Sequence, residues 1–148
     1  MNSAGNSTAA AAPATLTATV DVNTMTVLGS RQMLALYDAF SNAAEALHGV
    51  MIQPRCQMDD QGFKLNAAGD IVSDLVEFMY LCRDRLVQVA KHSKSESPTA
   101  NEERLFLILQ HEVRLRDGLA ELASMASAFV VEQQNVEWDH RHGRKVAA

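Results

Sequence analysis

The sequence predicts an all-α protein, an antiparallel helical bundle that follows a flexible N-terminal arm. Ala, Leu, Met, Val, Glu and Gln dominate its second half and aromatic residues make up only 5% of the chain, a composition that favours helix over sheet. Apolar residues recur at alternating spacings of three and four in three segments, as on one face of a helix. With 148 residues, the chain is long enough for a single hydrophobic core.

Residues 1–29 are expected to form the flexible, low-complexity arm. They are mostly small and polar, they carry Asp21 as their one charged side chain, and they sustain no helical period. Apolar and polar residues alternate over residues 16–22, which leaves open a short strand that orders on a partner. We therefore place the start of the bundle domain at residue 30 and its end at residue 140.

The first predicted helix begins at Ser30, a residue type that caps helices, and ends before Pro54, which cannot continue the hydrogen-bond ladder. Residues 55–65 then form a polar loop. One apolar stripe runs along the helix: Met33, Tyr37, Phe40, Ala44, Leu47 and Met51.

The second predicted helix spans about residues 66–92. Acidic residues lie in its first turns and Lys91 and His92 in its last turn, which is the charge order that complements a helix dipole. Its apolar stripe keeps the same spacing for seven positions: Ala68, Val72, Leu75, Met79, Cys82, Leu86 and Val89.

The third predicted helix starts at a capping box formed by Thr99 and Glu102. Its apolar stripe continues to Val136, so an unbroken helix over residues 99–138 would be roughly 60 Å long. We favour this long helix, straight or kinked at Gly118, because one helical glycine costs only about 1 kcal/mol relative to alanine. The alternative is a break at Asp117 and Gly118, which would give a monomeric bundle of four helices.

An unbroken third helix would extend far beyond its two shorter neighbours. Its apolar half, residues 119–131, would then lack an intramolecular partner, and uncovered stripes of this kind usually mark an interface. We therefore expect a two-fold homodimer in which each long helix covers the other. The predicted interface residues are Leu115, Leu119, Leu122, Ala126 and Phe129.

Residues 109–118 read LQHEVRLRDG and place several charges within the apolar stripe. A zinc protease needs His-Glu-x-x-His, and here Leu115 stands where the second histidine should be. A polar residue in an apolar seam often fixes the register between helices. We therefore predict that Glu112, Arg114 and Arg116 form a polar layer that sets register, with no catalytic residues among them.

Glu-x-x-His occurs twice, at Glu45 and His48 and again at Glu137 and His140. In di-iron bundles two such motifs bind metal together with a glutamate from each of two further helices. Glu77, the available lone carboxylate, falls on the polar face of its helix. A metal-binding bundle that uses the two motifs is therefore kept as an alternative, and the main prediction includes no metal and no cofactor.

The formal net charge is −5, and the basic residues of the C-terminal end gather in the tail, residues 141–148. An acidic body repels phosphate backbones, which disfavours nucleic acid as a partner. No stretch is apolar and long enough for a membrane span, the N-terminus lacks the pattern of a secretory signal, and two cysteines are too few for a disulfide framework. A cytoplasmic location is therefore expected.

These observations favour a non-enzymatic interaction protein: an adaptor, a chaperone-like subunit or a regulator that pairs with itself and with another protein. The Ser-, Thr-, Ala- and Asn-rich first 25 or so residues also resemble the export signals of specialised bacterial secretion systems. That resemblance implies an alternative function as a component or effector exported by a non-classical route.

Overall fold

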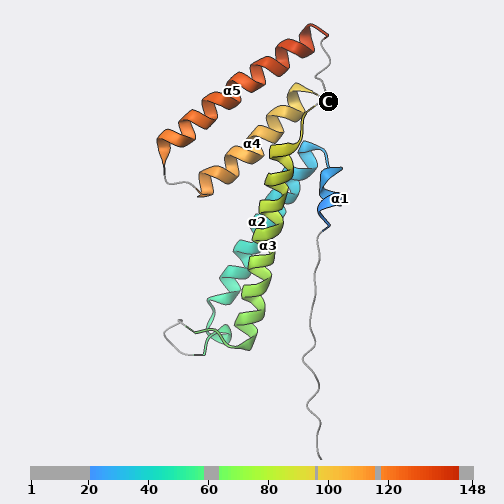
Figure 1. Ribbon diagram of the computed structural model, residues 1–148. Helices are drawn as coiled ribbons and strands as arrows, with labels where there is room; N and C mark the ends of the chain where they lie inside the picture. The colour runs from blue at the N-terminus through green and yellow to red at the C-terminus, as the bar shows by residue number, and fades with distance from the viewer. Residues whose placement is uncertain (1–20, 59–63, 96, 116–117, 144–148) are drawn as a thin grey trace, which may run out of the picture.

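The computed structural model describes residues 21–58, 64–95, 97–115 and 118–143, which are almost entirely helical (Figure 1). The predicted all-α class is therefore confirmed. None of the described helices is apolar and long enough to cross a membrane. In chain order the elements are α1 (Val22–Thr26), α2 (Ser30–Met51), the 3₁₀ turn η1 (Pro54–Cys56), α3 (Ala67–His92), α4 (Pro98–Leu115) and α5 (Leu119–Arg141).

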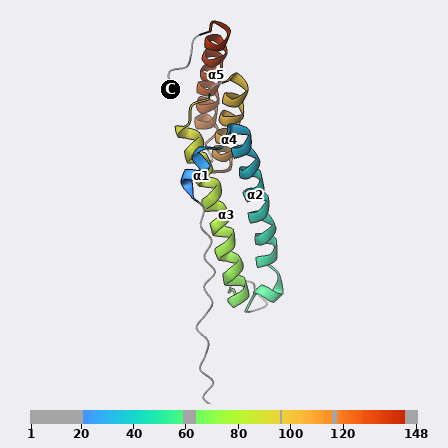
Figure 2. The same ribbon diagram turned by 90° about the vertical axis from the view of Figure 1, so that its right-hand side faces the viewer.

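Helices α2 and α3 lie side by side along most of their length and run in opposite directions, as both views show (Figures 1 and 2). The predicted stripe of α2 faces inward, with Met33, Tyr37 and Ala44 at most 2% exposed. Helix α4 packs across the upper part of this pair and contributes Leu107 and Ile108 to the core. The main core cluster comprises Met25, Met33, Tyr37, Leu86, Val87, Ala90, Leu107 and Ile108.

The described end of the predicted arm is structured. Asp21 caps α1 by accepting a 2.9 Å hydrogen bond from the backbone N–H of Asn23, and Met25 is 4% exposed within the core cluster. The buried Met25 side chain attaches residues 21–29 to the bundle. The sequence shows no sign of this attachment, because it has no helical period there. Residues 1–20, which include most of the alternating segment and most of the export-like segment, lie outside the described residues.

Two predicted helix starts are shifted by one or two residues. Ser30 is the buried first residue of α2, and the cap is Gly29, whose N–H donates to Gln32 Oε1 at 3.0 Å. In α4 the cap hydrogen bond is made by Ser97 and not by Thr99, because Ser97 Oγ accepts from the N–H of Ala100 at 3.2 Å. Pro98 then occupies the first helical position, where its missing N–H costs nothing.

The loop that joins α2 to α3 is anchored by backbone contacts. The Cys56 carbonyl accepts from the Asn66 N–H at 3.0 Å, and the Asn66 side chain caps α3 by accepting from the N–H groups of Ala68 and Gly69. Gly69 lies so close to this carbonyl that an added Cβ would be 2.3 Å from the oxygen. Cys56, within the segment predicted as a polar loop, is itself buried.

The prediction of one long third helix is wrong, because this segment forms two separate helices, α4 and α5. Helix α4 ends at Leu115, and Gly118 adopts an extended conformation (φ −92°, ψ 101°) as the N-cap of α5. Residues 116–117 lie outside the described residues. The break lets α5 fold back beside α4 (Figure 1). Leu122, Ala126 and Phe129 of the stripe that was predicted to cover a second molecule are thereby half-buried within this one.

Candidate functional site

A buried arginine on α4 connects three helices. Arg104 is 6% exposed, donates to the Ala90 carbonyl on α3 at 3.2 Å and donates through Nη2 and Nε to Asn101 Oδ1 at 3.0 and 3.3 Å. Its Nη2 also forms an ion pair with Glu132 on α5. A guanidinium suits this position because its planar fork carries five donors.

The same network continues along α5. Asn101 Nδ2 donates to Gln133 Oε1 at 3.0 Å, and Gln133 Nε2 donates to the Pro98 carbonyl and to Glu137 Oε1, both at 3.1 Å. Helix α5 is therefore attached to the bundle by side-chain hydrogen bonds to α4 as well as by partly buried apolar residues such as Phe129. Arg104 was not among the predicted site residues, and the one signal for it in the sequence is that Asn101, Arg104 and His111 follow the helical spacing of the adjacent apolar stripe.

Two of the three predicted register residues make contacts between helices. Glu112 is 5% exposed and pairs with Lys91 Nζ of α3 at 2.6 Å, while Arg114 pairs with Glu45 of α2 at 3.5 Å. These side chains thus tie α4 to its neighbours within one molecule. Arg116 lies outside the described residues.

His111, the first titratable residue of the LQHEVRLRDG segment, is buried where α4 meets α2 and α3. It is 4% exposed, its ring packs edge-on against Tyr37 at 6.0 Å, and its Nδ1 lies 3.9 Å from Asp84 Oδ1, beyond hydrogen-bond distance. Burial lowers the pKa of His111 below its usual value, and the nearby Asp84 carboxylate opposes this shift only in part. Burial also raises the pKa of Tyr37. Both groups are therefore neutral near pH 7.

This burial predicts acid sensitivity. The unfolded chain binds a proton at His111 near pH 6.5 and the folded chain binds it only at lower pH, so stability is full above pH 6.5 and falls as the pH decreases. The loss is at most about 1.4 kcal/mol per pH unit for one proton. Urea unfolding at about pH 7.5 and 5.5 checks it: His111→Gln should lose less stability on acidification than wild type. The exposed His48→Gln is the control, and equal losses in wild type and His111→Gln would contradict the prediction.

The structure does not bring the two Glu-x-x-His motifs together. Glu45 and His48 lie on α2, and Glu137 and His140 lie near the end of α5, which packs against α4 (Figure 1). Glu45 pairs with Arg114, and Glu137 accepts from Gln133 and lies 3.9 Å from Arg141 Nη2. Within the described part of the chain, no group of three or more potential ligands is placed to hold a metal ion.

The predicted interface residues divide into two groups. Leu115 and Leu119 flank the break between α4 and α5 and are 59% and 83% exposed. Leu122, Ala126 and Phe129 are half-buried on α5, and Phe129 packs against the core cluster. The second group is thus partly covered within the molecule, which removes the original reason for expecting a second chain there.

A groove of about 490 Å³ lies between α4 and α5. Its floor is apolar, and both Phe106 and Val130 are 56% exposed beside it. Glu102 and Glu137 are the charged residues among its described lining, together with the amides of Gln133 and Gln134. Such a surface suits recognition of an apolar side chain next to a positive charge.

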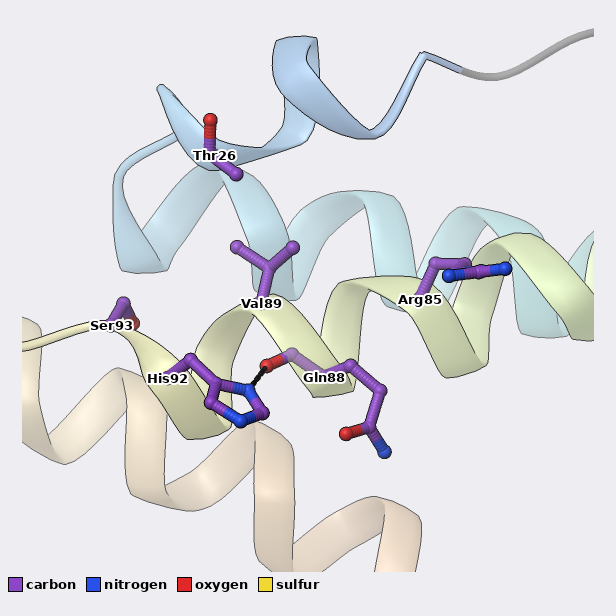
Figure 3. Close-up of a pocket in the computed structure, with 6 residues that line it drawn as sticks. All are labelled: Thr26, Arg85, Gln88, Val89, His92 and Ser93. Atoms are coloured by element: carbon purple, nitrogen blue, oxygen red, sulfur yellow. Dashed lines mark hydrogen bonds between the residues drawn. The ribbon is translucent and has the colours of Figure 1, made fainter.

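A second pocket, of about 380 Å³, lies where α1 meets the last turns of α3 (Figure 3). The His92 Nδ1 lies 2.7 Å from the Gln88 carbonyl, so this nitrogen carries the proton and donates to the end of the helix. The described residues that line this pocket include no carboxylate that could orient the His92 imidazole for acid or base catalysis. The described lining is Thr26, Arg85, Gln88, Val89, His92 and Ser93.

The groove between α4 and α5 is the candidate site, because it combines exposed apolar side chains with charges of one sign. The buried groups around His111, in contrast, are enclosed among three helices. Comparison with protein-family models, curated protein sequences and solved structures found no match to this chain.

Proposed function

We propose that this protein is a non-enzymatic helical interaction protein, an adaptor, chaperone-like subunit or regulator that binds its partners through α4 and α5. One observation carries the proposal. Helix α5 is 23 residues long, yet none of its side chains is fully buried. A helix that is held by a hydrogen-bond network and leaves Leu119, Val130 and Val131 more than half exposed is typical of a binding surface.

Self-association through these two helices is part of the proposal. Its physical reason is no longer an overhanging third helix but the apolar side chains that α4 and α5 leave exposed. The end of α4 and the start of α5 expose leucines beside the break, and an exposed apolar patch is stabilised when a second molecule covers it. A two-fold dimer supplies that cover from the same patch of an identical chain. Leu115 and Leu119, beside the break, are the most exposed of the predicted interface residues.

Sedimentation equilibrium of the untagged protein at about 1 to 50 µM tests this proposal, since dimers of ordinary affinity form in that range. We expect wild type to approach the dimer mass and Leu119→Glu to shift towards the monomer. The substitution should preserve folding, because Leu119 is 83% exposed and an acidic residue suits the first turn of a helix. Ile71→Glu on α3, at a site that is 60% exposed, is the matched control. A wild-type monomer across the whole range would reject the dimer.

A further inference from the structure

The groove between α4 and α5 has an apolar floor that follows the helix axis. On α4 the floor is formed by Phe106 and Leu109, and the 56% exposed Val113 continues the same face beyond the groove. On α5 it is formed by Ala126, Phe129 and Val130. Two packed helices with an apolar groove between them can bind the apolar stripe of a third helix.

The charges along this groove have one sign. Glu102 and Glu137 are acidic, and the described lining includes no lysine or arginine. Glu102 is exposed, and no described residue forms an ion pair with it. Arg141 approaches Glu137 at 3.9 Å but is 69% exposed, and such surface pairs contribute little. The groove therefore presents net negative charge beside an apolar floor.

We propose that this groove binds an amphipathic helix of another protein, with apolar residues along one face and lysine or arginine at its flank. This inference rests on the proposed function, because it names the partner of the same two helices. A second copy of the chain fits the groove poorly, since it would bring its own Glu102 and Glu137 against the first pair. Dimerisation thus uses the exposed residues at the break, and partner binding uses the groove.

Fluorescence anisotropy with the full-length protein and two labelled model peptides tests the inference. Both peptides carry leucines at helical spacing; one carries lysines at the flanking positions and the other carries glutamates. We expect the lysine peptide to bind wild type at least about tenfold more tightly than the glutamate peptide, with affinity that decreases as salt is raised. Phe106→Asp should weaken binding by about tenfold or more, because it removes the exposed apolar anchor.

Charge-reversal variants distinguish binding in the groove from non-specific electrostatic attraction to an acidic protein. Glu102→Lys should weaken binding of the lysine peptide and strengthen binding of the glutamate peptide. Glu77→Lys, an exposed site on α3 with the same change in net charge, should leave the preference unchanged. Equal binding of the two peptides to wild type, failure of the lysine peptide to bind, or equal effects of Glu102→Lys and Glu77→Lys would overturn the inference. A dimer that persists without peptide binding rejects the groove alone, whereas a monomer without peptide binding rejects the proposed function as well.

Discussion

Replacing Arg104 with alanine is expected to destabilise the protein by about 2 to 4 kcal/mol and to release α5 from α4. The substitution removes the donors that Arg104 provides to the Ala90 carbonyl and to Asn101 Oδ1, and it leaves a void at a site that is only 6% exposed. Glu132 loses its ion-pair partner but is 43% exposed, so water can solvate its carboxylate and the loss stays below that of a fully buried pair.

Two measurements on this variant separate global stability from the docking of α5. Urea unfolding reports the loss of stability, and amide hydrogen exchange reports whether α5 loses protection while α2 and α3 keep theirs. Arg104→Lys should recover only part of the loss, since an ammonium keeps the charge without the planar fork. The exposed Arg31→Ala should change stability by less than about 0.5 kcal/mol. Unchanged exchange throughout α5 in Arg104→Ala would show that the network does not hold this helix.

Gly69→Ala is expected to destabilise the protein by about 2 to 3 kcal/mol, although alanine is the better helix former. A Cβ at this position would lie 2.3 Å from the Cys56 carbonyl oxygen and 3.0 Å from the Leu65 side chain. The backbone must therefore move, which weakens the 3.0 Å hydrogen bond from the Asn66 N–H to the same carbonyl. Thermal and urea unfolding of the variant measure the effect.

Gly49→Ala is the matched control, because it makes the same change inside α2 where nothing lies within 4 Å of the added Cβ. It should stabilise the protein by about 0.5 to 1 kcal/mol through helix propensity. Opposite signs for the two variants would assign the cost at Gly69 to close approach. If Gly69→Ala were as stable as wild type, the η1 turn would have to be free to move away from α3.

The sequence by itself determined the features that depend on local chemistry. The spacing of apolar residues predicted α2 and α3 to within about a residue, and the inward stripe of α2 is the one that its period indicated. Pro54 ends α2 as expected, because a proline removes a backbone donor wherever the chain goes afterwards. Propensity, capping and period act over one or two turns, so no knowledge of distant residues was needed.

Only the tertiary structure decided how the C-terminal half is arranged. The stripe from Leu105 to Val136 has the same period whether the helix is continuous or broken at Gly118, so spacing could not choose between them. The choice lies in contacts between distant residues: Arg104 with Glu132, and Asn101 with Gln133. The groove next to them exists because α5 turns back on α4. A one-dimensional pattern gave the buried face of α2, whereas on α3 the buried Val76, Val87 and Ala90 lie outside the predicted stripe. The partner of a helix face is fixed by hydrogen bonds and packing between segments far apart in the chain.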